Sequence, residues 1–382
     1  IKFGSPAYRM EYLLILASHT LKVAISCTML PNLLLMTVEQ GNGVNETVIL
    51  TVKQGYDLDK LFQTNELCKA LAAKSLTIEA AVDQLEDLID APATWSGPAY
   101  VLACGGCSAF VAPLAFGGSL ADSVVAGVLG LLVGILDLLT GKLEALSYTY
   151  EVLAATLTSV FGGNDPATQI CYTGVTLSTL FIILPGLSIA TSFIELNSLN
   201  VISGTVRLAT GLVKTLSLAF GILLGSRIAT LYSPCPSAGA LTDWDHSQWI
   251  MPLFLILFAL CQGVQLRASP RQFGIITVAV FVAFGISQVL TRISFGTEPT
   301  AAVAAFGVGV VGNVYSRISH NPGIAPILAG ILMLVPGGLG VRSSLSLIAP
   351  AVSASGTSGA VVVQMILISL CIALGVLCSR IV

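Results

Sequence analysis

The stretch FIILPGLSIATSFIELNSLNVISGTVRLATGLVKTLSLAFGILLGSRIA (181–229) decides the fold, because a matching stretch closes the chain. The second copy reads ILMLVPGGLGVRSSLSLIAPAVSASGTSGAVVVQMILISLCIALGVLCSRIV (331–382). In each copy an apolar run ends in Pro-Gly, and a small, polar segment leads to Ser-Gly-Thr and then to an apolar run that closes on Ser-Arg. Pro185 precedes Gly204 by almost the same spacing as Pro336 precedes Gly356, so the two copies keep one register.

The Pro-Gly pairs predict interrupted membrane helices. Proline removes a backbone donor and glycine frees the chain from helical dihedrals, and in lipid such broken backbone is tolerated only against protein or water. Interrupted apolar segments at corresponding places in two halves of a transporter indicate its binding site. We therefore expect Pro185, Gly186, Pro336 and Gly337 to border a substrate site.

The composition is that of a polytopic α-helical membrane protein. Of 382 residues, 55% are apolar and 10% are charged, and the mean hydropathy is +0.89. Apolar runs of about 20 residues, long enough to cross the hydrocarbon core of a bilayer, recur from Ser96 to the end. Membrane lipid is thus an expected partner.

Other function classes find little support. The net charge of −3 and the lack of a basic tract argue against nucleic acid. The pair Cys104 and Cys107 has redox-motif spacing, but it lies in an apolar run without His or carboxylate neighbours, so we interpret it as a small-residue packing face. No metal or other cofactor is predicted. The sequence has no nucleophile with a base at a spacing useful for catalysis, so it does not indicate an enzyme.

The domain boundaries follow the change in composition. Residues 1–95 hold most of the carboxylates and predict a small soluble α+β domain, with a helix opening at Ser5-Pro6, two strands around 41–43, and helices over 57–74 and 77–89. We divide the rest into a first five-span repeat (96–232), a connecting loop (233–247) and a second five-span repeat (248–382). The ten predicted spans are 97–116, 119–140, 145–162, 167–194, 203–231, 248–266, 273–292, 299–317, 323–340 and 357–381.

Five spans per repeat is an odd number, so the second repeat must enter the membrane from the opposite face, as an inverted repeat. The distribution of Lys and Arg between the loops favours a cytosolic N-terminal domain. The sequence therefore predicts an integral multi-pass membrane protein in which that domain faces the cytosol, or the matrix or stroma in an organelle.

Glu195 and Arg207 are the first candidates for substrate binding. Arg207 can bind a carboxylate in two-pronged fashion and Glu195 can receive an ammonium group. Asn200, Ser203 and Gly204 lie between these two residues in the sequence, where they supply polar groups and let a substrate approach the backbone closely. Alternatively, the two charges lie at span ends and pair with each other, and the polar residues cap a helix.

A second set follows Pro336. A helix that begins after the glycines would present free N–H groups to an anion, with Arg342 and Ser343 alongside. Snorkelling of Arg342 to the membrane surface is the equally supported alternative.

Carboxylates inside apolar spans are candidates for proton coupling. Asp122 and Glu151 are our candidates, with Glu151 favoured because it lies deeper and burial favours the neutral form of a carboxylic acid. Lys214 could pair with one of them, or it could snorkel. Asp137 is interpreted as an interfacial partner of Lys142.

The ordered motifs of the whole chain resemble those of the threonine/serine exporter family, in its eukaryotic branch. They are GSPAYRMEYLL (4–14), LPN (30–32), GGSLADS (117–123), LPGL (184–187), ELNSLNVISGTVRL (195–208) and LVPGGLGVRSSLSL (334–347). The resemblance implies ten spans in two halves after a soluble domain, and export of threonine or serine driven by the proton gradient. It also marks Tyr8, Arg9 and Glu11, which we expect to gate the cytosolic mouth.

Two hypotheses follow. The leading one is a secondary transporter that exports small hydroxylated amino acids, coupled to protons. The other is a scaffold or accessory subunit of a membrane complex that keeps the exporter fold without transport. Homo-oligomers or membrane-complex partners suit either hypothesis.

Overall fold

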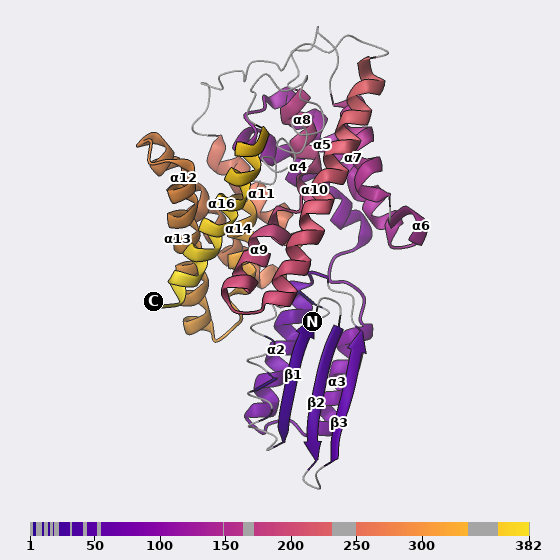
Figure 1. The fold of residues 1–382 in the computed structure, drawn as a ribbon, viewed down its shortest axis with the longest axis vertical. Coiled ribbons are helices and arrows are strands. Elements are labelled where there is room, and N and C mark those ends of the chain that lie inside the picture. The colour runs from indigo at the N-terminus through magenta and orange to yellow at the C-terminus, as the bar shows by residue number, and fades with distance from the viewer. Residues whose placement is uncertain are drawn as a thin grey trace.

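The protein is described here by a computed structural model, which covers residues 3, 4, 10, 14, 15, 18, 23–30, 33–40, 44–51, 55–147, 149–162, 172–230, 250–334 and 358–381. A bundle of helices forms one part of the molecule, and a small sheet and a helix pair extend from one end of it (Figure 1). A β-sheet beside mostly apolar helices agrees with the predicted membrane protein with an α+β extension.

The N-terminal sheet is a three-stranded antiparallel meander of β1 (Ala24–Leu30), β2 (Leu33–Gln40) and β3 (Val44–Thr51). The predicted pair of strands around 41–43 is confirmed, since β2 and β3 are in register from Gln40 opposite Val44 onward. Strand β1 was not predicted as such. Its addition is physically reasonable because an isolated two-stranded hairpin is only marginally stable in water.

Both predicted helices of this part are confirmed, as α2 (Leu58–Ala72) and α3 (Ile78–Asp90). Asp57 caps α2 by accepting a hydrogen bond from the backbone N–H of Lys60 (3.1 Å). Thr77 likewise caps α3. The buried Lys60 ammonium donates to the carbonyl of Ala91 (2.5 Å) at the end of α3, where the helix dipole favours a cation.

Within the described residues, six helices are long and apolar enough to cross a membrane, or seven if one bent pair is counted as a single span. The six are α4 (Gly97–Ala115), α5 (Leu120–Thr140), α10 (Val201–Thr230), α12 (Phe273–Arg292), α13 (Thr297–Ser319) and α16 (Ser358–Cys378). Three shorter apolar helices accompany them, namely α7 (Tyr150–Phe161), α11 (Met251–Gln265) and α14 (Ile324–Leu334). There are also short turns of helix: α6 (Glu144–Ser147), η2 (Pro270–Gln272) and η3 (Ser379–Ile381).

Small residues let the membrane helices approach closely, as is usual where no hydrophobic effect drives helices together. A Cβ atom at Gly134 of α5 would lie 2.9 Å from the Cβ of Cys104 on α4. Cys104 and Cys107 are fully buried with free thiols, which agrees with a packing face. Helices α10 and α7 are equally close, since a Cβ atom at Gly221 of α10 would lie 2.6 Å from the carbonyl oxygen of Val152 on α7.

The two halves of the chain share one apolar core. It joins Val111 of α4 and Leu187 to Phe258 of α11 and Ile372 of α16. The rings of Phe181 and Phe258 meet edge to face, with 5.5 Å between their centroids. Described residues of the two predicted repeats are therefore packed directly against each other.

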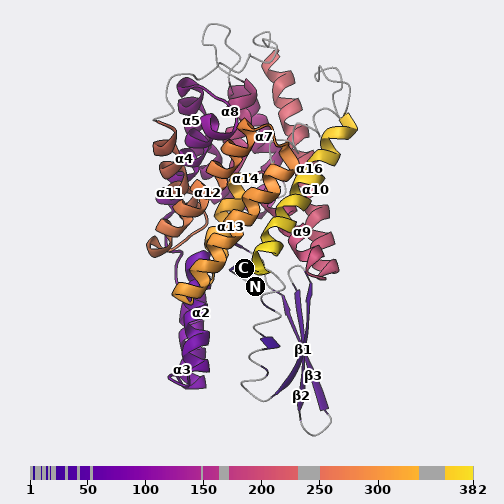
Figure 2. The same cartoon turned by 90° about the vertical axis from the view of Figure 1, so that its left-hand side faces the viewer.

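The N-terminal part is docked on loops of the second half. The backbone N–H groups of Leu58 and Asp59 donate to the carbonyls of Leu266 (3.2 Å) and Arg267 (3.0 Å). The Trp95 indole donates to the carbonyl of Ala268 (2.9 Å) and stacks on Phe273. Further along α2, Lys69 donates to Asn321 (2.9 Å) after α13. Figure 2 shows the sheet and the α2–α3 pair extending from the same end of the helical part.

Candidate functional site

One helix of the first half is broken at the predicted Pro-Gly. The α-helix α8 (Tyr172–Thr179) continues into the 3₁₀ turn η1 (Leu180–Ile182), and α9 (Gly186–Asn197) begins directly after Pro185. The two parts are bent by 57°. Pro185 has no N–H to continue the α8 ladder, so the chain restarts as a new helix. The predicted interruption is thus confirmed for Pro185 and Gly186, and their role in binding stays a prediction.

A charged cavity of about 600 Å³ lies on the side of this break that faces the N-terminal part. We call it the inner cavity. The segment 55–57 and Lys60 from the N-terminal part line it together with Pro185 and Ser188 at the break. Its ionisable side chains come from five places in the chain: Asp57 and Lys60, Asp137, Glu151, Lys214, and Arg267.

Two polar clusters lie in the inner cavity. Glu151 of α7 forms an ion pair with Lys214 of α10 (3.1 Å), as one of the sequence alternatives predicts. Asp137 of α5 accepts a hydrogen bond from the hydroxyl of Tyr100 on α4 (2.8 Å). Tyr150 adds a phenol that is 9% exposed. This arrangement differs from the predicted pairing of Asp137 with Lys142.

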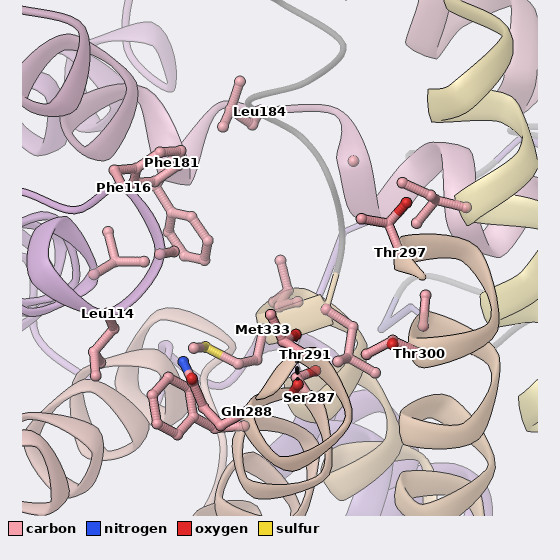
Figure 3. Close-up of a pocket in the computed structure, with 18 of the residues that line it drawn as sticks. Leu114, Phe116, Phe181, Leu184, Ser287, Gln288, Thr291, Thr297, Thr300 and Met333 are labelled. Atoms are coloured by element: carbon pink, nitrogen blue, oxygen red, sulfur yellow. Dashed lines mark hydrogen bonds between the residues drawn. The ribbon is translucent and has the colours of Figure 1, made fainter. Parts of the chain in front are cut away.

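A second cavity, of about 430 Å³, lies on the other side of the break, and we call it the outer cavity (Figure 3). It reaches Leu114 near the end of α4, which begins close to the N-terminal part and is about 28 Å long at 1.5 Å per residue. Its described lining holds no charged side chain. The polar groups are hydroxyls and one amide, supplied by α12 and α13: Ser287, Gln288, Thr291, Thr297 and Thr300.

The two cavities share part of their walls. Phe181, Leu184, Leu187 and Leu332 line both of them, and we call these four residues the partition. Three lie at or beside the break in the α8–α9 helix, and Leu332 lies on α14 of the second half. Figure 3 shows Phe181 and Leu184 at one rim of the outer cavity, across from Thr291 and Thr300. An apolar layer contributed by both halves therefore lies between a charged cavity and one whose described lining is uncharged.

Glu195 and Arg207 are brought together, but outside both cavities. The fully buried Glu195 carboxylate pairs with Arg207 (3.2 Å) and accepts a hydrogen bond from Ser203 (2.8 Å). Arg207 also donates to the Thr191 hydroxyl (3.4 Å). This geometry is the mutual pairing named as the alternative, and substrate contact by these two residues stays a prediction.

The residues between that pair shape the turn from α9 to α10. The backbone N–H of Asn200 donates to the carbonyl of Glu195 (3.0 Å). A Cβ at Gly204 would lie 2.9 Å from the carbonyl oxygen of Ser192, so this glycine lets the two helices cross closely. Asn200 and Ser203 border a smaller cavity that is also lined by Cys27 of β1.

Tyr56 connects the N-terminal part to the Glu195–Arg207 pair. Its hydroxyl lies within hydrogen-bonding reach of Arg207 and Thr191. Burial raises the pKa of this phenol, with Glu195 adding to the rise and Arg207 opposing it. Tyr56 therefore remains neutral at physiological pH, and its oxygen can accept from the Arg207 guanidinium. The sequence carried no sign of this contact, which depends on the docking of α2.

The remaining predicted residues divide into two groups. Asp122 is buried at the start of α5, where it forms a capping box with Ser119. Its carboxylate accepts a hydrogen bond from the backbone N–H of Ser119 and so caps the N-terminus of the helix. The other predicted residues lie outside the described residues: Tyr8, Arg9, Glu11, Pro336, Gly337, Arg342 and Ser343. Among the described residues, no cluster of His, Cys, Asp or Glu could hold a metal ion.

Comparison with known proteins assigns the family. The family model described as "Putative threonine/serine exporter" matches residues 1–229, and one described as "Threonine/Serine exporter" matches residues 252–382. The chain belongs to the threonine/serine exporter family.

Three eukaryotic proteins are among its relatives. The chain is 30% identical to pheromone-regulated membrane protein 10 of Candida albicans over 90% of its own length and 32% of that protein. It is 28% identical to the protein of the same name from Saccharomyces cerevisiae, over 45% of that protein. An uncharacterized protein of Schizosaccharomyces pombe is 26% identical, over 47% of its length.

The chain thus spans less than half the length of these curated relatives. No solved structure matches it.

Proposed function

We propose that this family member is a secondary transporter that exports threonine and serine in exchange for protons, through ten spans arranged as two inverted repeats. The observation that carries the proposal is the pair of cavities on either side of the broken helix, which share the partition. A transporter must expose one site to each side in turn, and a thin apolar layer between two cavities suits that task. The bent pair and the three short apolar helices supply the candidates for the further spans.

The start of α9 is the proposed place for the substrate carboxylate. Pro185 and Leu187 line the inner cavity, and Gly186 and Leu187 line the outer one. The first turn of a helix presents backbone N–H groups that lack partners in the helix, and its dipole favours an anion. A carboxylate held there would lie at the partition, within reach of both cavities.

The Glu151–Lys214 pair is the proposed proton switch. With Glu151 charged, the pair is neutral and the cavity accepts an amino acid. A proton on the Glu151 carboxylate leaves the Lys214 charge uncompensated, and that charge repels the ammonium group of the substrate. Binding of a proton and of an amino acid therefore oppose each other, as exchange requires. We favour Glu151 over Asp122, whose carboxylate caps α5.

If the N-terminal part lies in the cytosol, the inner cavity faces the cytosol and is the loading side. The segment 55–57 then forms part of the cytosolic mouth. Tyr8, Arg9 and Glu11 remain candidates for gating this mouth.

Flux measurements on purified protein in proteoliposomes test the proposal. Labelled serine and threonine should move in response to a pH gradient, and Glu151→Gln should abolish this response because it fixes the uncharged form of the switch. The matched control is Glu86→Gln on the exposed surface of α3, which should transport normally. Absence of flux of any amino acid from folded wild-type protein would reject transport and favour the scaffold hypothesis.

A further inference from the structure

The inner cavity contains a carboxylate that the proton switch does not use. We propose that Asp137, flanked by Tyr100 and Tyr150, binds the α-ammonium group of the transported amino acid, an inference that rests on the proposed function. Asp137 comes from α5, Tyr100 from α4 and Tyr150 from the start of α7, so three helices converge on this place. All three side chains line the inner cavity.

Asp137 retains capacity for a ligand. One of its oxygens accepts the Tyr100 hydroxyl (2.8 Å), and a carboxylate offers about four lone-pair sites. Among the described residues no ion pair involves Asp137, in contrast to Glu151, which is paired with Lys214. Asp137 is a partly buried carboxylate near the end of α5, and a substrate ammonium group would supply it with both an opposite charge and hydrogen bonds.

Tyr150 is the independent sign that a ligand belongs here. Its side chain is 9% exposed, and its buried hydroxyl has no hydrogen bond of acceptable geometry with the described residues. It lies within hydrogen-bonding reach of Asp137, although the geometry falls short of a hydrogen bond. A buried hydroxyl without a partner costs free energy, which a ligand in the cavity can recover.

The proposed subsite for the substrate carboxylate lies in the same cavity as Asp137. The start of α9, the proposed carboxylate subsite, lines the same cavity through Pro185 and Ser188. An α-amino acid has its two charged groups on adjacent carbons, so separate anion and cation subsites select zwitterions over simple acids or amines. Lys214 stays bound to Glu151 while Asp137 holds the ligand, so the switch and the ammonium subsite remain distinct.

Serine binding to the purified full chain tests the inference, with two analogues as probes. Ethanolamine keeps the ammonium and hydroxyl groups, and 3-hydroxypropanoate keeps the carboxylate and hydroxyl. Asp137→Asn should weaken serine binding about tenfold or more, since it removes a charge-assisted contact. It should also abolish competition by ethanolamine while leaving competition by 3-hydroxypropanoate within about twofold.

A second variant guards against misfolding. Tyr150→Phe keeps the ring and removes only the unpaired hydroxyl, and it should weaken serine binding a few fold without lowering the melting temperature. Asp87→Asn, on the exposed surface of α3, is the matched carboxylate control and should bind serine normally.

The outcomes separate the two proposals. Unchanged serine binding by Asp137→Asn, or equal loss of both analogues, overturns the ammonium subsite while the transporter proposal stands. A folded wild-type protein that binds no amino acid overturns both.

Discussion

A fully buried carboxylate such as Glu195 is stable in an apolar span only with compensation. Arg207 supplies the opposite charge, and Ser203 donates a hydrogen bond. Leaving one charge of such a pair alone is costlier than removing both, because the remaining ion keeps its desolvation penalty. The sequence identified both residues and named their pairing, but it could not choose between pairing and substrate contact, since the choice depends on how α9 and α10 cross.

Glu195→Gln should therefore destabilise the protein by roughly 3 kcal/mol, at the low end for a buried pair because Arg207 keeps some solvent contact. The double variant Glu195→Gln/Arg207→Gln should be closer to wild type in thermal unfolding in detergent. A double variant no more stable than the single one would show that the ion pair is not the cause.

At the scale of elements, the features set by local sequence were predictable. Pro185 ends one helix and starts another, and the caps Asp57 and Thr77 begin α2 and α3, because each depends on backbone chemistry within a few residues. The cluster of Asp137, Tyr100 and Tyr150 was missed for the opposite reason. Its members come from three helices, and only tertiary packing brings them together.

Helix contacts also set the geometry of the Glu151–Lys214 pair, the proposed proton switch. A Cβ atom at Gly221 would lie 2.6 Å from the Val152 carbonyl, next to Glu151, so Gly221→Ala should push α7 away from α10 and loosen the Glu151–Lys214 pair. We expect a lower melting temperature and reduced proton-coupled flux for this variant.

Gly285→Ala on α12 is the matched control. Nothing lies within 4 Å of its added Cβ, and alanine is the better helix former, so this variant should be at least as stable as wild type. Equal effects of the two variants would contradict the argument.

At the scale of the whole molecule, the N-terminal part contacts both halves. Tyr56 reaches the Glu195–Arg207 pair of the first half, while Leu58 and Asp59 bond to the loop that follows α11. Motion between the halves would therefore be felt by segment 55–59. This coupling was invisible in the sequence because it depends on docking over long chain separations.

Loss of the Trp95 anchor tests this docking. Trp95→Ala removes the hydrogen bond to Ala268 and the stacking on Phe273, so the amides of Leu58 and Asp59 should exchange hydrogen faster. Mass spectrometry of exchanged peptides measures this, with β2 as the internal reference. Uniform acceleration in the sheet and in α2 would indicate general unfolding instead of undocking.

In the proposed transporter, the partition is the barrier between the two cavities. Leu184→Ala removes apolar volume from this layer, so we expect labelled serine to leak from proteoliposomes without a pH gradient. Leu132→Ala changes an exposed leucine on α5 and serves as the control. If the Leu184→Ala protein does not leak serine, the four residues are not the barrier.

The unlike chemistry of the two cavities has a kinetic consequence. In the proposed transporter, an amino acid meets charged side chains in the inner cavity, whereas the described lining of the outer cavity offers only hydroxyl and amide side chains, so its dissociation constant should be larger on the release side. Accumulated product outside would then rarely rebind. Such a carrier works as a rectifier, whose export rate follows the internal amino-acid concentration and is almost insensitive to the concentration outside.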